Sequence, residues 1–390
     1  MEEKPFHLAD HSQIKKGDVT DVYFTRVVSA LEKAGIDRRV TAEVRASSFP
    51  ADWRWAVFSG LEEARRLFSG KDVEVSALPE GSVFFTEEPV FAISGRYLDF
   101  AVFETALLGF LCQASGVATK AARCKLAAGA RPVYSFGARR MHPGIAPMIE
   151  RNAYVGGCDG VATVISGRLM GKEPIGTMSH SLILVVGSDI EAFKIFDRAM
   201  PDDVARVALV DTFNDEKFGA LGAVEALGDR LHGVRLDTPK SRRGNFLKIL
   251  QEVRWELDIR GHKGVKIMVS GGVDEDVIAE CNRYADAYGV GTAISNAPVV
   301  DFSMDIVEVE GELRAKRGKM SGKKQIARCP ACGLRQPVRP DTYSCPNCGG
   351  TLEMLVVEQI KVGEIVAPHE TVDQIRARAI SQYQDLSIDE

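Results

Sequence analysis

Four cysteines near the C-terminus have the spacing of ligands that share one metal ion. They stand in Cys-Pro-Ala-Cys-Gly and Cys-Pro-Asn-Cys-Gly-Gly, at Cys329, Cys332, Cys345 and Cys348. Two thiolates two residues apart can bind one ion, and the following glycine allows the tight turn behind them. Four thiolates complete a tetrahedral shell, so we expect structural zinc, with a four-thiolate iron centre as the main alternative. Such a shell leaves no open position for a substrate, so the active site must lie elsewhere.

A second group of residues with chemical potential follows short apolar runs in the middle of the chain. It is rich in Arg, Asp and Gly and contains a single histidine, His180. This mixture suits an anionic substrate that chelates a metal, because Arg pairs with phosphate or carboxylate, Asp holds Mg²⁺ and Gly amides surround phosphate. In chain order the group comprises Phe136, Arg139, Arg140, Asp159, His180, Asp211, Arg235, Asp237, Ser270, Gly271, Gly272, Gly291 and Thr292.

Two glycine pairs in this group could hold phosphate. Ser270-Gly-Gly-Val-Asp274 precedes a predicted helix, so its backbone N–H groups could form a phosphate-binding turn. A plain left-handed turn is the alternative, and the later pair Gly289 and Gly291 favours phosphate, since paired phosphate loops recur on the last strands of barrel enzymes. The chain has no Walker motif and no complete G-x-G-x-x-G, which argues against a P-loop or a Rossmann site.

These residues must be positioned by a repeated strand-helix pattern between about 120 and 298. Near-continuously apolar strands alternating with helices predict a parallel sheet covered by helices. About seven such units favour a closed or nearly closed β/α barrel, in which reactive groups lie at the carboxyl ends of the strands. A doubly wound open sheet is the alternative. The predicted strands are 132–136, 160–164, 176–180, 207–211, 233–237, 265–270 and 288–291.

The flanking regions have a different texture. Residues 1 to about 115 mix short strand-like and helical runs, and Asp99–Gln113 resembles a buried helix. From about 300 a further strand leads into a basic run, Arg314–Lys324, then the cysteines and an amphipathic stretch at Glu370–Arg378. With 390 residues, the chain is long enough for two or three domains.

Composition and the chain start exclude several classes of protein. The net charge of −5 does not mark a nucleic-acid-binding protein. The N-terminus has no apolar signal region and no run of about 18 apolar residues occurs, so we expect neither secretion nor a membrane partner. The remaining cysteines are scattered through apolar segments, as buried free thiols of a cytoplasmic protein would be: Cys112, Cys124, Cys158 and Cys281.

Several stretches together resemble the type II phosphoribosyltransferases, the group of nicotinate, nicotinamide and quinolinate enzymes. The resemblance covers about 20 to 320 and implies an N-terminal α/β open sandwich packed on an incomplete β/α barrel. The expected domains are 1–118, completed by about 300–322, then the barrel at 119–299 and a zinc module with a helix at 323–390. The stretches that carry it are Ser115-Gly-Val-Ala-Thr-Lys, Ser135-Phe-Gly-Ala-Arg-Arg-Met-His-Pro-Gly, Gly156-Gly-Cys-Asp-Gly, Gly176-Thr-Met-Ser-His-Ser, His232-Gly-Val-Arg-Leu-Asp, Ser270-Gly-Gly-Val-Asp and Gly289-Val-Gly-Thr.

The resemblance also implies a reaction and a role for each site residue. The nicotinate branch transfers phosphoribosyl from phosphoribosyl pyrophosphate (PRPP) to nicotinate for NAD biosynthesis, in a homodimer with shared active sites or in a higher assembly of such dimers. His180 would accept a phosphoryl group from ATP, and Asp237 would lie near Mg²⁺ and the ribose. The pyridine base would meet Tyr23 of the partner subunit, Phe136, Arg139, Asp159 and Arg235. PRPP and its phosphates would meet Arg140, Thr177, Ser270, Gly271, Gly272, Gly291 and Thr292.

Two departures from the family pattern leave the choice of base open. The nicotinate branch often has Arg-x-Asp-Ser-Gly-Asp where this chain has Arg235-Leu-Asp-Thr-Pro-Lys240, which lacks the acidic end. Asp159 also stands where the nicotinamide branch uses a carboxylate. Nicotinamide is therefore the nearest alternative substrate, and quinolinate is less favoured because that branch lacks a segment like 176–181.

Two readings from other classes of protein are weaker. A barrel lyase or aldolase would need a strand-end lysine as its Schiff-base nucleophile. Lys266 lies within a predicted strand and Lys240 in a loop, so neither fits. A non-enzymatic zinc-ribbon adaptor would leave the strand-end Arg and Asp residues unexplained.

Overall fold

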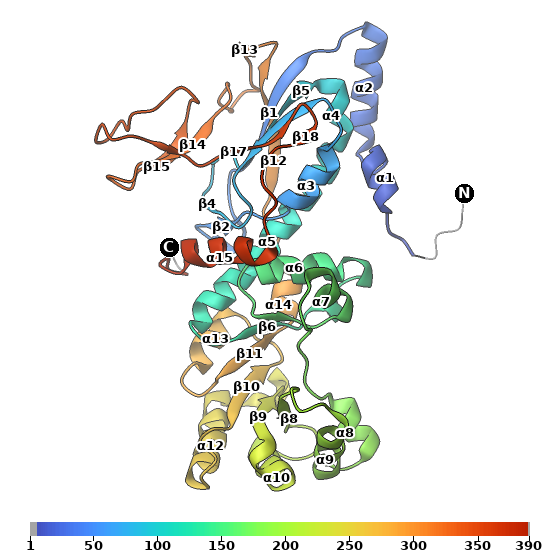
Figure 1. The fold of residues 1–390 in the computed structure, drawn as a ribbon, viewed down its shortest axis with the longest axis vertical. Helices are drawn as coiled ribbons and strands as arrows, with labels where there is room; N and C mark the ends of the chain where they lie inside the picture. Colours follow the sequence, from blue (N-terminus) through green and yellow to red (C-terminus); the bar gives the residue numbers. More distant parts are fainter. Residues whose placement is uncertain (1–5, 389–390) are drawn as a thin grey trace. The chain divides into compact units, whose positions relative to one another are not determined.

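The structure of the protein, a computed structural model, describes residues 6–388 and divides into two compact units (Figure 1). The first unit contains the chain up to Thr119 and from Pro298 onward, and the second contains Lys120–Ala297. The division falls inside one long helix, α5 (Glu104–Ala128). The sequence placed the corresponding boundaries at 118 and 299.

The first unit is built on a seven-stranded antiparallel sheet. Central strand β1 (Arg39–Ala46) explains how it forms: Val40, Ala42 and Val44 alternate into the apolar core, while the intervening polar side chains are buried with partners. In sheet order the strands are β13 (Glu312–Leu313), β12 (Phe302–Val309), β1, β5 (Phe91–Arg96), β3 (Val73–Ala77), β17 (Val357–Lys361) and β18 (Glu364–Ile365). A small pair, β2 (Ala56–Val57) and β4 (Val83–Phe84), lies in the same unit.

Helices bury their apolar residues in the core of this unit. In α3 (Leu61–Phe68), Leu61, Ala64, Leu67 and Phe68 are all buried. The stretch Tyr97–Ala128 is long and apolar enough to span a membrane, but 56% of its apolar window is buried, as in a core helix. The other helices are α1 (His11–Lys16), α2 (Val22–Ala34), η1 (Pro50–Asp52), α4 (Tyr97–Phe100), η2 (Ala101–Phe103) and α15 (Val372–Tyr383).

The segment predicted as one C-terminal module is divided in the structure. Its first part forms a separate three-stranded sheet of β15 (Arg335–Val338), β14 (Gln325–Arg328) and β16 (Glu353–Met354). Its second part returns to the sandwich, where β17 pairs with β3 and Tyr383 of α15 stacks on Trp55 at 5.9 Å. Residues 357–383 therefore belong structurally to the first unit.

The second unit is a parallel sheet that curls into a half-barrel, as the sequence predicted. The first strand of this unit lies between its second and its last strand, which is the order of a barrel rather than of a doubly wound sheet. The order is β7 (Gly160–Val161), β6 (Val133–Ser135), β11 (Ala287–Val290), β10 (Lys266–Ser270), β9 (Leu231–Leu236) and β8 (Arg206–Leu209).

The barrel is open between β7 and β8, where the sequence predicted a strand at 176–180. That prediction was wrong: Ile175 donates one backbone hydrogen bond to Val161, after which the chain leaves the sheet and His180 starts helix α8. The remaining helices of this unit cover the sheet. They are η3 (Ala138–Arg140), η4 (Pro143–Ile145), α6 (Ala146–Val155), α7 (Val164–Met170), α8 (His180–Val186), α9 (Asp189–Ala199), α10 (Glu216–Leu227), η5 (Gly228–Arg230), α11 (Lys240–Arg243), α12 (Phe246–Ile259), α13 (Glu275–Cys281) and α14 (Thr292–Ser295).

Candidate active site and metal centre

His180 lies at the carboxyl edge of the parallel sheet, on the first residue of α8. Its Nδ1 is 2.9 Å from the hydroxyl of Thr212, which follows β8. Its Nε2 is 3.6 Å from Asp237 Oδ2 and 4.0 Å from Asp211 Oδ1. The side chain is 38% exposed, so a ligand can reach the ring. Thr212 therefore orients the imidazole, and Nε2 faces two carboxylates.

Asp211 is the most enclosed of these groups. One oxygen, Oδ2, accepts the backbone N–H of Asp237 at 3.0 Å, which joins the ends of β8 and β9. The other, Oδ1, is buried and has no hydrogen-bond partner among residues 6–388. Burial raises the pKa of the Asp211 carboxyl, and the charge of Asp237 raises it further against the opposing effect of His180. A buried oxygen of this kind is available to a ligand or a metal ion.

Arg235 connects the strand ends on the other side of Asp237. Its Nε donates to Ser270 Oγ and its Nη1 to Thr177 Oγ1, both at 2.8 Å. Ser270 Oγ in turn donates to Asp237 Oδ1 at 2.8 Å, and Nη2 of Arg235 is 3.5 Å from the same oxygen. This network fixes Asp237 through a charge and a hydroxyl, so the second carboxylate is preorganised.

Phe136 presents a ring beside this network. The guanidinium carbon of Arg235 is 5.3 Å from the ring centroid, and Tyr134 stacks on the ring at 6.3 Å. The ring also covers the chain at Gly289, where an added Cβ would lie 2.5 Å from the Phe136 ring. Gly289 is thus required for the aromatic surface to exist.

The glycine turn after β10 has the conformation that its sequence predicted. Gly271 and Gly272 both have positive φ, at 78° and 66°, which favours glycine. A Cβ on Gly271 would lie 2.9 Å from the carbonyl and carboxylate oxygens of Asp237. The turn is therefore packed directly against the β9 end. Gly291 and Thr292 occupy the corresponding position after β11, at the start of α14.

Asp159 does not join this cluster, and its expected placement at a strand's carboxyl end was wrong. It immediately precedes β7, its N–H donates to Val133 O, and its Oδ2 accepts the Val133 N–H at 2.9 Å and pairs with Lys125 at 3.0 Å. Val133 is the first residue of β6, so these contacts lie at the amino ends of two parallel strands.

Three predicted residues are accessible rather than part of the network. Arg139 and Arg140 lie exposed on η3, just after β6, and their side chains make no hydrogen bond or ion pair within the described part of the chain. Tyr23 is on α2 of the first unit and is 53% exposed. The sequence also missed two positions as site residues: Thr212, which holds His180, and Arg243, which is buried behind the glycine turn.

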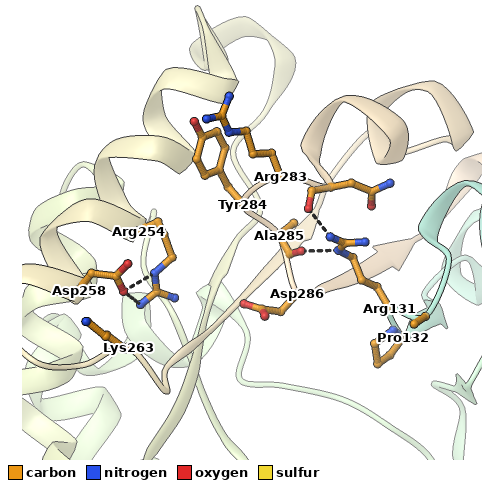
Figure 2. A pocket seen from close by; sticks show the side chains of 11 residues that line it. Arg131, Pro132, Arg254, Asp258, Lys263, Arg283, Tyr284, Ala285 and Asp286 are labelled. Atoms are coloured by element: carbon orange, nitrogen blue, oxygen red, sulfur yellow. Dashed lines mark hydrogen bonds and ion pairs between the residues drawn. The ribbon is translucent and has the colours of Figure 1, made fainter.

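A cavity of about 590 Å³ lies at the opposite, amino edge of the sheet (Figure 2). Arg131 enters it before β6 and donates to the backbone carbonyls of Asn282 and Ala285. Arg254 of α12 binds Asp258 at 2.7 Å and donates to the carbonyl of Val265. Both guanidinium groups are engaged in holding loops, which is typical of the stabilising end of a barrel.

The four predicted metal ligands converge in the first unit. Their Sγ atoms all lie within 4.8 Å of one another, with Cys329 to Cys348 at 3.5 Å and Cys332 to Cys345 at 3.6 Å. The apolar core around them is small and includes Ala327, Val338 and Leu352. A four-sulfur donor set of this geometry fits a tetrahedral metal ion, which would crosslink a module too small to hold itself together.

An ion pair ties this module to the sandwich. Arg335 of β15 donates from Nε and Nη2 to the two carboxylate oxygens of Glu88, at 2.7 and 2.8 Å. Nη2 also donates to the carbonyl of Val83, and the guanidinium carbon is 5.2 Å from the Phe85 ring centroid. The Glu88 side chain is 4% exposed, so the pair is largely shielded from water. The metal-ligand module is thus anchored through a bidentate contact.

Comparisons with known proteins agree with this architecture. Residues 21–115 match the N-terminal domain of quinolinate phosphoribosyl transferase, and residues 117–305 match its C-terminal domain. A solved structure of nicotinate-nucleotide pyrophosphorylase from Pyrococcus furiosus is 51% identical and has a TM-score of 0.95, covering 97% of this chain and 98% of that chain. The structure of human nicotinic acid phosphoribosyltransferase shares the fold at a TM-score of 0.69 and 20% identity, covering 95% of this chain and 94% of that one.

A nicotinate phosphoribosyltransferase of Mycobacterium tuberculosis is 34% identical over 271 residues. That match covers 65% of this chain, which spans 57% of the mycobacterial relative. The two family domains meet at residues 115 and 117, inside α5. The chain belongs to the quinolinate and nicotinate phosphoribosyltransferase family, the type II phosphoribosyltransferases.

Proposed function

We propose that this protein is a nicotinate phosphoribosyltransferase. It would form nicotinate mononucleotide and pyrophosphate from nicotinate and PRPP, with ATP hydrolysis coupled through a phosphohistidine, in NAD biosynthesis. The observation that carries the proposal is the setting of His180, whose ring is held by Thr212 and faces Asp211 and Asp237 at the barrel's carboxyl edge. A merely structural histidine would have no need of two carboxylates around an accessible nitrogen.

The geometry supports a nucleophilic role for Nε2. In the tautomer whose Nδ1–H donates to Thr212 Oγ1, the lone pair of the ring is on Nε2, and this is the tautomer that we propose. Nε2 would attack the terminal phosphorus of ATP, forming an N–P bond as the bond to the ADP oxygen breaks. Water would later cleave the N–P bond and release phosphate, which returns the free histidine. The 38% exposure of the side chain leaves room for the attack.

The proposed base site combines a flat ring with cations. Phe136 would stack on the pyridine ring, with Tyr23 of the partner subunit on its other face. Arg139, which is exposed three residues after Phe136, would pair with the carboxylate of nicotinate, and Arg235 would lie near the base and the sugar. The exposure of Tyr23 is compatible with a shared site in a homodimer.

PRPP would lie along the ends of β9, β10 and β11. Its 5′-phosphate would meet the turns at Gly271, Gly272, Gly291 and Thr292, with Ser270, Thr177 and Arg140 nearby. The orphaned Oδ1 of Asp211 and Oδ2 of Asp237 both face one point near His180, and carboxylate oxygens are the ligands that Mg²⁺ accepts beside substrate phosphates. When bound, Mg²⁺ would neutralise charge on the departing pyrophosphate.

Zinc is the proposed occupant of the four-cysteine site, in a structural role. The support is the four-sulfur donor set, which leaves no position for a reacting group. Metal analysis of the purified protein should give about one zinc per chain. Iron, together with visible absorption of a thiolate-iron centre, would contradict the assignment. We also expect the enzyme to be cytoplasmic and not to bind nucleic acid.

The base is the decisive test of this proposal. Turnover should be measured with nicotinate, nicotinamide and quinolinate in turn, with PRPP and Mg²⁺, and with and without ATP. We expect mononucleotide from nicotinate, stimulated by ATP. Quinolinate is the second candidate, because the matched family domains carry its name; its use would be marked by release of CO₂. Asp159 no longer supports nicotinamide, because it lies at the other end of the strands. Absence of a mononucleotide from all three bases would refute the proposal.

A further inference from the structure

The loop that departs from the family pattern, Thr238–Arg243, carries cations where the acidic end is missing. Lys240, Arg242 and Arg243 form the short helix α11. Arg243 is buried, with 7% of its surface exposed, although it stands in a basic run that the sequence alone would place in solvent. Its guanidinium reaches two strand ends at once. The loop thus places a positive charge inside the carboxyl edge of the sheet.

Arg243 holds both sides of the glycine turn. Its Nε donates to Thr238 O at 2.7 Å, and its Nη2 donates to the carbonyls of Ser270, at 3.0 Å, and Gly271. In a trans peptide the C=O and the following N–H point in opposite directions. Because Arg243 draws the Ser270 and Gly271 carbonyls toward itself, the N–H groups of Gly271 and Gly272 point away from it. Those amides face the side from which an anion would approach.

The charge of Arg243 is not neutralised by a carboxylate in contact. Within residues 6–388 no Asp or Glu oxygen lies at ion-pair distance from its guanidinium, which is met by backbone carbonyls and by the Phe246 ring at 4.5 Å. Burial lowers the pKa of Arg243, while the charges of Asp237, Asp211 and Asp274 act in the opposite direction. Guanidinium stays protonated in proteins, so a buried positive charge lies directly behind the turn.

Lys240 lies beside the same turn, next to Gly272. A Cβ on Gly272 would be 3.3 Å from Lys240 Cε and 3.7 Å from its Cγ, so the lysine stem packs along the glycine. The residue is exposed, and its ammonium has no ion pair or hydrogen bond in the described part of the chain. A flexible cation beside two glycine amides matches the charge of a phosphate monoester.

We propose that the Thr238–Arg243 loop is the second wall of the phosphate site: Arg243 is a positioning residue for the Gly271–Gly272 turn, and Lys240 binds the phosphate directly. This inference rests on the proposed function and extends it, because it assigns the 5′-phosphate of PRPP to two residues outside the family's glycine loops. The basic loop can thereby bind a phosphate, which the acidic loop end of the nicotinate branch would repel.

Kinetics of Arg243→Met, Arg243→Lys and Lys240→Met test the two roles. For Arg243→Met we expect the KM for PRPP to rise about tenfold or more, with the KM for nicotinate little changed. Arg243→Lys should lie between it and the wild type. Lys240→Met should raise the KM for PRPP a few-fold, on the order of an exposed ion pair. In Arg243→Ala, guanidinium ion at a non-denaturing concentration should restore part of the PRPP affinity, which it would not do for a general loss of packing.

Controls and a binding probe separate this inference from the proposed function. Arg131→Met removes another carbonyl-bound arginine and Lys248→Met another exposed lysine; both should leave the KM for PRPP unchanged. Binding of inorganic phosphate to the full chain, by calorimetry, does not depend on turnover. The wild type could prove inactive as a transferase while Lys240→Met and Arg243→Lys still weaken its binding of phosphate. That result would refute the proposed function but support the inference that this loop forms part of a phosphate site. Wild-type KM for PRPP and unchanged phosphate binding in both variants would overturn the inference.

Discussion

The two edges of the parallel sheet use the same residue types in opposite ways. At the amino edge, Arg131 and Arg254 are engaged by loop carbonyls and Asp258 around the cavity of Figure 2. At the carboxyl edge, His180 faces two carboxylates, and Asp211 keeps a buried oxygen without a hydrogen bond. The guanidinium groups of Arg131 and Arg254 at the first edge are thus used in holding the fold. The polar groups at the second edge are held in place but left partly unsatisfied, as expected where a ligand completes the interactions.

The largest effect should come from Asp237 at the carboxyl edge. Asp237→Asn removes the charge that faces His180 and Arg235 while keeping the shape, so we expect kcat/KM to fall about a thousandfold with a small change in Tm. Asp258→Asn is the matched control at the amino edge, because it weakens the Arg254 pair instead. It should lower Tm slightly and leave kcat/KM intact. Equal losses of activity in the two variants would erase the contrast between the edges.

His180→Ala should separate coupling from transfer. Without the imidazole no phosphohistidine can form, so ATP stimulation should vanish while slow ATP-independent transfer remains. A loss of about a hundredfold or more in the ATP-stimulated rate is expected for removal of such a group. The check is the initial rate with and without ATP, together with acid-labile labelling of the protein by radioactive ATP. Full ATP stimulation in the variant would remove His180 from the mechanism.

The sequence predicted which strands, helices and metal ligands are present better than it predicted where particular segments lie. Alternating strands and helices were enough for the half-barrel, and the spacing of Cys329 and Cys332 was enough for the metal ligands, since both patterns are local. Residues 176–180 have strand composition, but a strand also needs a partner, and only one backbone bond to β7 forms there. Whether such a run joins a sheet is decided by tertiary pairing, which composition does not encode.

Asp159 was misplaced and Arg243 was not identified at all, for a related reason. A polar residue beside a short apolar run can end one strand or precede the next, and the hydrogen bond from Val133 decides that Asp159 precedes β7. Arg243 stands in a basic run, which normally indicates a solvated surface. Its burial comes from three carbonyl acceptors on two loops far apart in sequence. Neither outcome could be obtained from neighbouring residues alone.

Arg131→Met tests whether the amino edge contributes to the stability of the fold. The substitution leaves the carbonyls of Ala285 and Asn282 without their donor, so we expect the free energy of unfolding to fall by about 2–3 kcal/mol. Kinetic constants should stay near wild type, because this edge holds no proposed substrate group. Chemical denaturation and steady-state kinetics on the same preparation are the measurements. A variant of wild-type stability with a raised KM for PRPP would show that the amino edge, and not only the carboxyl edge, takes part in binding the substrate.

The smallest expected effect is a change in Tm on substitution of Asp211, and its direction is opposite to that expected for the groups at the amino edge. Its pKa is raised in the folded state, so the folded protein holds this proton more tightly than the unfolded chain, whose carboxyl titrates near 3.8. The stability linked to this group is therefore full below pH 3.8 and is lost as the pH rises through the folded-state value. Asp211→Asn removes that loss, so its Tm at pH 7 should exceed wild type by about 1–2 °C, and the difference should shrink toward pH 4. Activity should fall in the same variant, because an ionised carboxylate at this position lowers stability but is needed for function.

Asp286→Asn is the matched control at the amino edge, where the carboxylate of Asp286 accepts the Ile267 N–H. This variant should show no gain in Tm. A lower Tm for Asp211→Asn at pH 7 would mean that Asp211 stabilises the fold, as the amino-edge groups do.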